Sequence, residues 1–174
     1  MSNQEPNAVE KLVSAYHRMV ERLKHAIEEA EEHTAPNLQR NLERAKERAV
    51  ELGELTREEA EKVAEYVRRD VQEAGSYLAE TGHDLRDWLR VDLALIEAGL
   101  LNMFSRVADR SRLEMLEFQR ALQEGPLYHT GEVAGPGVLA CTACGQEVHF
   151  HDAGHIPPCP KCHGTTFRRP TPGK

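Results

Sequence analysis

Apolar residues in the first half of the chain recur every three or four positions, a pattern that predicts amphipathic helices. Over residues 7–32 they form one stripe, and the opposite face carries Glu, Lys and Arg. Residues 34–36 end this helix, because the position before a proline disfavours helical backbone. The stripe consists of Val9, Leu12, Val13, Tyr16, Val20, Leu23 and Ile27.

Two further helices follow by the same criterion. The second is expected over residues 38–53, where Gly53 is a plausible C-cap. The third begins after Thr56, which forms a capping-box pattern with Glu59 three residues later. It is expected to end near Gly82.

A long fourth helix is predicted over residues 84–123, and the Gly-Pro pair at residues 125–126 ends it. Helices with such regular apolar stripes pack on one another or on a partner chain. An antiparallel helical hairpin or small bundle is therefore the first interpretation, and a coiled-coil homodimer is the second. The low aromatic content, 5%, predicts a modest core in the monomer and makes self-association through the helices a credible expectation.

Four cysteines near the C-terminus form two C-x-x-C pairs separated by fourteen residues. This spacing is close to that of a four-cysteine zinc ribbon. A structural zinc ion takes four ligands in a tetrahedron, and thiolates suit it. Glycines after each pair, Gly145 and Gly164, can adopt positive φ and let the chain curl around a metal. The expected ligands of one Zn²⁺ per chain are Cys141, Cys144, Cys159 and Cys162.

Other uses of the cysteines are less consistent with the sequence. Disulfides need an oxidising compartment, and the N-terminus lacks the basic start and apolar stretch of a signal peptide. A redox C-x-x-C would not need a second pair, and haem attachment at residues 159–163 would leave the first pair unexplained. Iron bound by the same four sulfurs, as in a rubredoxin, remains the minority alternative to zinc.

Histidines surround the cysteines, but they are expected to be solvated loop residues. Four cysteines already complete a tetrahedral shell, whereas a catalytic zinc keeps one position open. The same loop could still bind a second metal weakly. The histidines concerned are His149, His151 and His155 between the pairs, and His163 after the second pair.

The composition of the chain changes after the predicted helices. Residues 127–137 are rich in glycine and are expected to form a linker, followed by strands at residues 138–140, 147–150 and 165–168. The sequence thus predicts a mainly α protein, with a helical domain at residues 1–126 and a small β zinc ribbon at residues 127–174.

Charge limits the classes of partner. The chain carries a net charge of −7, and residues 131–174 contribute three acids and four bases, so the rest carries −8. An acidic helical part would be repelled by nucleic acid and by anionic membranes. No apolar run is long enough to span a membrane. The cytoplasm, where cysteines remain reduced, is the expected compartment.

Carboxylates on the third helix, notably Asp70, Glu73, Glu58 and Glu59, resemble candidate acid–base pairs. On a helix this rich in charge, a solvated face with ion pairs between successive turns is the favoured interpretation. We also find no nucleophile–base pair or phosphate-binding loop in the sequence, so the protein is not expected to be an enzyme.

Several segments together resemble one bacterial family. Residues 45–59 (AKERAVELGELTREE) and 67–70 (VRRD) resemble the YbeL-like zinc-ribbon-containing proteins. In the tail, residues 128–135 (YHTGEVAG), the two C-x-x-C pairs and residues 167–170 (FRRP) resemble the same family. The resemblance implies an N-terminal helical region, a C-terminal zinc ribbon and a metal-binding role for the four cysteines. It implies no biochemical activity, because the family is a domain of unknown function.

The leading functional hypothesis is a non-enzymatic adaptor that binds a protein partner, with a structural zinc site. An alternative is a ribbon associated with nucleic acid, as in transcription or translation factors. Its phosphate contacts would be Lys161, Arg168, Arg169 and Lys174, with Phe150 or Phe167 stacking on a base. In a further interpretation, residues 168–170 bind the acidic helices of the same chain. A rubredoxin-like electron-transfer module is the third hypothesis.

Overall fold

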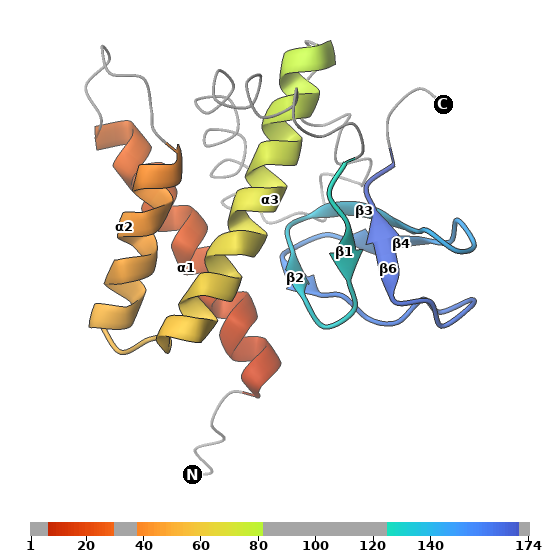
Figure 1. Cartoon of the computed structure of the whole chain (residues 1–174), viewed down its shortest axis with the longest axis horizontal. Coiled ribbons are helices and arrows are strands. Elements are labelled where there is room, and N and C mark those ends of the chain that lie inside the picture. Colours follow the sequence, from red (N-terminus) through yellow and green to blue (C-terminus); the bar gives the residue numbers. More distant parts are fainter. Residues whose placement is uncertain (1–6, 30–37, 82–124, 171–174) are drawn as a thin grey trace.

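The computed structural model describes residues 7–29, 38–81 and 125–170. Helices α1 (Ala8–Glu29), α2 (Leu38–Glu51) and α3 (Arg57–Thr81) form one part of the molecule, and short strands form the other (Figure 1). The predicted order of helices followed by a small β region is confirmed. The predicted fourth helix, over residues 84–123, lies outside the described residues. The strands are β1 (Tyr128–His129), β2 (Val133–Ala134), β3 (Gly137–Cys141), β4 (Glu147–Phe150), β5 (Gly154–His155) and β6 (Thr166–Arg168).

The three helices form a bundle in which each helix contacts the other two. The apolar stripes predicted from the sequence face inward, and Tyr16, Val20, Leu23, Val63 and Val67 are fully buried. Burial of these side chains is the main source of stability for helices of this kind. No described helix has a stretch of the length and apolar character needed to cross a membrane.

The turn between α2 and α3 is the one that local sequence signals predict. Gly53 adopts positive φ (68°), and the Glu54 N–H donates to the Ala49 carbonyl (3.0 Å), which closes the end of α2. The Glu59 N–H donates to Thr56 Oγ1 (3.2 Å), and the Thr56 N–H donates to Glu59 Oε2 (2.9 Å). These two bonds are the capping box expected at the start of α3.

The strands form two small antiparallel sheets, one in the order β1-β6-β3-β4 and one that pairs β2 with β5. The expected linker at residues 127–137 is wrong, because Tyr128 pairs with Phe167 and Val133 pairs with His155. Pairing with strands further along the chain gives this glycine-rich segment its extended backbone. The apolar core of the ribbon consists of Tyr128, Ala134, Leu139, Cys141, Phe150, Ile156, Cys159 and Phe167.

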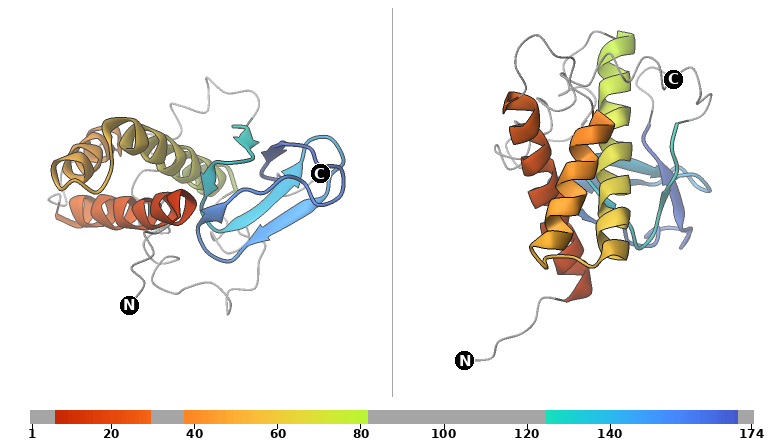
Figure 2. Two further views of the ribbon diagram at one scale, coloured as in Figure 1. Left: turned by 90° about the horizontal axis from the view of Figure 1, so that it is seen from below. Right: turned by 60° about the vertical axis from the view of Figure 1, so that its left-hand side comes forward.

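The ribbon packs against α1 and α3, and α2 lies on the far side of the bundle (Figure 2). Val133 and Ala153 from the ribbon belong to the same buried apolar cluster as the helices. His17 Nε2 on α1 also lies 3.2 Å from Asp152 Oδ1. The boundary predicted at residues 126 and 127 stays a prediction, since residues 82–124 are not described.

Candidate metal centre and the buried network beside it

The four cysteines come together although the two pairs lie in separate turns. Their sulfur atoms all lie within 4.8 Å of one another. Cys141 is the last residue of β3, and Cys144 follows in the turn that leads to β4. Cys159 and Cys162 lie in the turn before β6. The Sγ atoms of Cys141 and Cys162 are 3.6 Å apart, as are those of Cys144 and Cys159.

The spacing of the sulfur atoms fits a tetrahedral metal ion. A Zn–S bond of about 2.3 Å places the sulfurs of a regular tetrahedron about 3.8 Å apart. The two observed distances of 3.6 Å match this geometry. An all-thiolate donor set is typical of structural zinc and of iron–sulfur sites. The four cysteines could therefore hold a metal ion, and an ion bound by all four would have no position left for a substrate.

The pKa values of the thiols also favour a bound cation. Burial raises the pKa of Cys159, but the backbone N–H groups of Cys162 and Lys161 outweigh this effect and lower the pKa to about 6. At Cys162 the N–H of Gly164 lowers the pKa, but hydrogen bonding with the neighbouring sulfurs raises it to about 12. Four adjacent thiols cannot all ionise without a positive charge among them, and a divalent metal supplies it.

Both cysteine turns have the same backbone hydrogen bonds. The Gly145 N–H donates to the Cys141 carbonyl and the His163 N–H donates to the Cys159 carbonyl, each at 2.9 Å. Gly145 has φ 72° and His163 has φ 59°, so the residue after each second cysteine is left-handed. In the second turn this residue is a histidine, not the glycine expected from the sequence. Gly164 has a different role, because a Cβ there would lie 3.1 Å from Cys141 Sγ and 3.2 Å from Cys162 Sγ.

The histidines do not extend the metal centre. His149, His151 and His163 are exposed, and His149 Nε2 lies 3.8 Å from Glu147 Oε2 on its own strand. His155 is half-buried in β5, where it pairs with Val133. In the parts of the chain that the structure describes, the four cysteines are the one group of metal-ligating side chains with suitable geometry.

The expectation that Asp70 and Glu73 lie on a solvated face is wrong. Asp70 is fully buried, and only 15% of the Glu73 side chain is exposed. The ribbon covers this part of α3 and supplies Arg169, whose Nη2 lies 3.7 Å from Asp70 Oδ1 and whose Nε lies 3.3 Å from Glu73 Oε2. The interpretation in which residues 168–170 bind the acidic helices is thus correct for Arg169. Of the other two carboxylates, Glu58 is exposed and Glu59 pairs with Lys11 (2.7 Å).

Asp70 is the centre of this network. It accepts hydrogen bonds from the Tyr16 hydroxyl (2.7 Å), the Tyr128 hydroxyl (2.8 Å) and the Gly135 N–H (2.7 Å). Burial raises the pKa of both tyrosines well above the ordinary value, so both hydroxyls keep their protons. Three donors satisfy the buried carboxylate, and two of them come from the ribbon.

Glu73 also lies within hydrogen-bonding distance of the Tyr128 hydroxyl. That hydroxyl has one proton, which is directed at both carboxylates, and it accepts a bond from Arg169 Nε (3.1 Å). One proton cannot fully satisfy two carboxylates, so Asp70 and Glu73 compete for it. Burial raises the pKa of Glu73 to about 7, against the opposing effects of Arg169 and of the hydrogen bond from Tyr128, so the protonated form of Glu73 is accessible near neutral pH.

Arg69 makes a second connection between α3 and the ribbon. Its Nη1 pairs with the Glu132 carboxylate, and its Nη2 donates to the Val133 carbonyl (3.0 Å). The guanidinium carbon lies 3.8 Å from the centre of the Tyr128 ring and 5.4 Å from that of Tyr66. This stacking on Tyr128 could not be predicted from the sequence, because only Tyr66 is near Arg69 in the chain.

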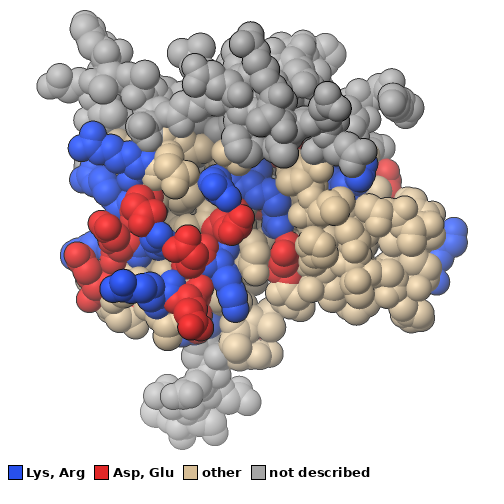
Figure 3. Space-filling model, in the orientation of Figure 1, with Lys and Arg blue, Asp and Glu red and all other residues tan. Residues whose placement is uncertain are grey.

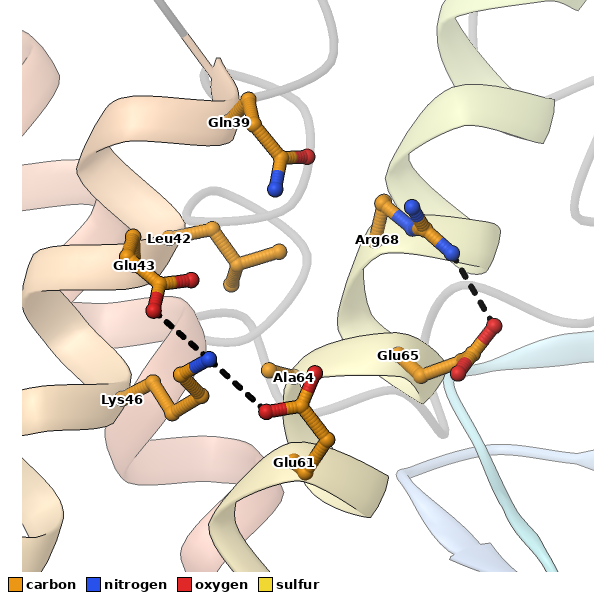
Figure 4. Close-up of a pocket in the computed structure, with 8 residues that line it drawn as sticks. All are labelled: Gln39, Leu42, Glu43, Lys46, Glu61, Ala64, Glu65 and Arg68. Carbon is orange, nitrogen blue, oxygen red and sulfur yellow. Dashed lines mark hydrogen bonds and ion pairs between the residues drawn. The ribbon is translucent and has the colours of Figure 1, made fainter.

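An open groove between α2 and α3 carries charged side chains that pair with one another (Figure 4). Lys46 Nζ lies 2.7 Å from Glu43 Oε1 and 2.8 Å from Glu61 Oε2, and Arg68 Nη2 lies 3.0 Å from Glu65 Oε1. Ion pairs of this kind, in which the carboxylates are exposed, are typical of a solvated helix surface. The lining residues are Gln39, Leu42, Glu43, Lys46, Glu61, Ala64, Glu65 and Arg68.

The fold and the four-cysteine centre define a zinc-ribbon protein in which the ribbon is attached to a helical bundle. The family described as a zinc-ribbon containing domain matches residues 25–171, so this chain belongs to that family. The resemblance to the YbeL-like proteins is confirmed. A protein of Escherichia coli K12, named "uncharacterized protein YbeL", is 33% identical over 124 residues, which cover 69% of this chain and 74% of the relative. A protein of the same name from Escherichia coli O157:H7 is similar to the same extent. No solved structure matches the chain.

Proposed function

We propose that this chain is a non-enzymatic adaptor, in which one zinc ion at the four cysteines holds a ribbon that binds a protein partner. The exposed part of the ribbon supports this proposal. The tips of the cysteine turns project into solvent, and few of their side chains are charged (Figure 3). An exposed surface of low charge suits contact with another protein better than contact with a polyanion. The exposed residues at these tips include Thr142, Ala143, Pro160, Lys161 and His163.

The observation that carries the proposal is the burial of the residues that a nucleic-acid interface would need. Phe167 is fully buried, Phe150 is 8% exposed, and neither ring presents a face for base stacking. Arg169 is 6% exposed and is paired with Asp70 and Glu73, so it does not reach phosphates. Lys161 and Arg168 remain as exposed bases, and Lys174 lies outside the described residues.

Elemental analysis with a visible spectrum tests the metal. The protein should be purified without a histidine tag, which could itself retain metal. We expect one zinc per chain and no absorption in the visible range, since zinc has a filled d shell. Iron with thiolate charge-transfer bands would replace the adaptor proposal with the electron-transfer alternative. A Cys159→Ser variant should lose the metal, whereas a Thr165→Ala variant at an exposed neighbouring position should retain it.

Site-specific photocrosslinking in cells tests the adaptor role. A photoreactive amino acid at Ala143 places the probe on the exposed ribbon tip, and the same amino acid at exposed Glu47 on α2 is the matched control. We expect a discrete protein adduct from position 143, lost on introducing Cys159→Ser, and no such adduct from position 47. Absence of any protein adduct at position 143 would contradict the proposal, as would an adduct to nucleic acid.

A further inference from the structure

We propose that metal binding at the four cysteines locks the ribbon onto α1 and α3, so that metal occupancy controls the stability of the helical bundle. This inference depends on the metal-binding part of the proposed function and not on the adaptor role. It goes beyond a zinc ion that folds only its own ribbon, because it assigns the metal an effect on helices at least sixty residues earlier in the chain.

The first step connects the metal centre to the residues that face the helices. Cys141 pairs with Phe167 across β3 and β6, and Phe167 pairs with Tyr128 across β6 and β1. The Thr142 N–H also donates to the Thr166 carbonyl (3.0 Å). Tyr128 and Phe167 share one apolar cluster with Cys141 and Cys159. A ribbon this small depends on its metal for folding, so these pairings are lost when the metal leaves.

The second step connects the same strands to α3. Arg169 follows β6 directly and places a buried guanidinium beside Asp70 and Glu73. Its Nη1 and Nη2 donate to the carbonyls of Pro136 (3.1 Å) and Gly135 (3.3 Å), which hold the side chain in this position. The Tyr128 hydroxyl and the Gly135 N–H then complete the hydrogen bonds of Asp70.

The third step is the energetic consequence for α3. Loss of one partner of a buried ion pair is strongly destabilising, because the other charge remains without compensation. If the ribbon unfolds, Asp70 loses Arg169, Tyr128 and Gly135 together. It retains the Tyr16 hydroxyl and Arg69, whose Nε lies 3.6 Å from Asp70 Oδ1. The bundle also loses the apolar cover that Val133 and Ala153 provide. Water would then reach α3, and its backbone would open more often.

Hydrogen–deuterium exchange of the full-length chain tests the inference. The protein is compared in its zinc-loaded form and after removal of zinc by a chelator under reducing conditions, with metal content measured on the same samples. We expect amides of residues 66–74 to exchange about tenfold faster or more once zinc is removed. Unchanged exchange in α3, together with loss of protection in the ribbon, would overturn the inference. Failure to bind zinc at all would instead refute the metal site itself, so the two failures are distinguishable.

A pair of variants tests the proposed link at one residue. Arg169→Met removes the buried guanidinium and keeps an unbranched side chain, whereas Arg168→Met changes its exposed neighbour. With zinc bound, R169M should show faster exchange in α3 close to that of the metal-free protein, and R168M should match the wild type. An R169M protein that retains full protection of α3 would overturn the role of Arg169. If R169M does not fold, the exchange rates of the wild type with and without zinc still test the inference.

Discussion

Gly164 occupies space between two of the four sulfur atoms. A methyl group at this position would lie 3.1 Å from Cys141 Sγ and 3.2 Å from Cys162 Sγ, closer than ordinary carbon–sulfur contacts allow. The φ of Gly164 is outside the left-handed region, so the requirement for glycine is steric. The neighbouring His163 does adopt the left-handed conformation. The sequence motif shows that a glycine is present, and the structure shows why.

Replacement of Gly164 by alanine should therefore weaken metal binding. The added methyl group displaces two ligand atoms, and changes beside metal ligands typically cost about tenfold or more in affinity. The affinity should be measured by competition with a chromogenic zinc chelator. Thr165→Ala is the control, since this exposed neighbour should bind zinc as the wild type does. Equal affinities for the two variants would contradict the steric role of Gly164.

The protonation of Glu73 gives a prediction about pH. Burial raises the pKa of this carboxyl to about 7, although the cation of Arg169 opposes the shift. Tyr128, Asp70 and Arg69 are the other charged or titratable groups that face it. In the unfolded chain the pKa is about 4.3, so between about pH 4.5 and 7 the folded state binds more protons. The contribution of Glu73 to stability therefore decreases as pH rises through this range and is constant above it.

Glu73→Gln removes this titration and keeps the shape of the side chain. The difference in unfolding free energy, wild type minus E73Q, should fall by about 1 kcal/mol between pH 6 and pH 8. Effects of pH on the cysteines are common to both proteins and cancel in the difference. Denaturant unfolding of the zinc-loaded proteins at the two pH values measures it. Parallel changes in the two proteins would show that Glu73 does not titrate in this range.

At the scale of secondary-structure elements, the beginning of α3 depends on its capping box. Thr56→Ala removes the hydroxyl that accepts the Glu59 N–H, and such a change costs about 1 kcal/mol. The midpoint of urea unfolding should decrease accordingly. Thr56→Ser keeps the hydroxyl and should unfold close to the wild type. If the serine and alanine variants unfold at the same concentration, the cap contributes nothing to stability.

The elements that sequence reasoning predicted are those specified by nearby residues. The stripes of α1, α2 and α3 and the capping box at Thr56 all operate within a few turns of helix. Strands β1, β2 and β5 have two residues each, too few to show an alternating pattern. Their extended backbone comes from partners elsewhere in the chain, such as Phe167 opposite Tyr128. No local pattern indicates that pairing.

The candidate site also has one part that local sequence predicts and one part that it does not. The spacing of the cysteines predicts the metal centre, because each C-x-x-C turn is local and zinc geometry limits how two turns can combine. The partners of Asp70 could not be predicted, since its hydrogen-bond donor Tyr128 lies 58 residues away. On its own helix Asp70 lies three residues after Val67 and four before Ala74, beside the apolar stripe, so helical spacing is the signal that could have indicated its burial. The buried state requires the folded ribbon.

For the whole molecule, the distribution of charge separates the two main functional hypotheses. Acidic and basic side chains intermingle over the helices, whereas the visible face of the ribbon is mostly uncharged (Figure 3). The chain as a whole carries −7, which opposes approach to a polyanion. Among the described ribbon residues that remain exposed, Lys161 and Arg168 are the bases. Two bases release few counterions from nucleic acid, and the binding they support is weak.

We therefore expect no specific binding to nucleic acid. Fluorescence anisotropy with labelled duplex DNA and with single-stranded RNA should give dissociation constants no tighter than about 10⁻⁴ M at physiological salt, the weak end of non-specific binding. The zinc-loaded protein is required, because the metal holds the two cysteine turns in place. Tight binding that falls steeply with salt, and that Lys161→Ala with Arg168→Ala abolishes, would replace the adaptor proposal with the nucleic-acid alternative. Tight binding that the double variant retains would place the contact outside the described ribbon surface and would equally contradict the charge argument.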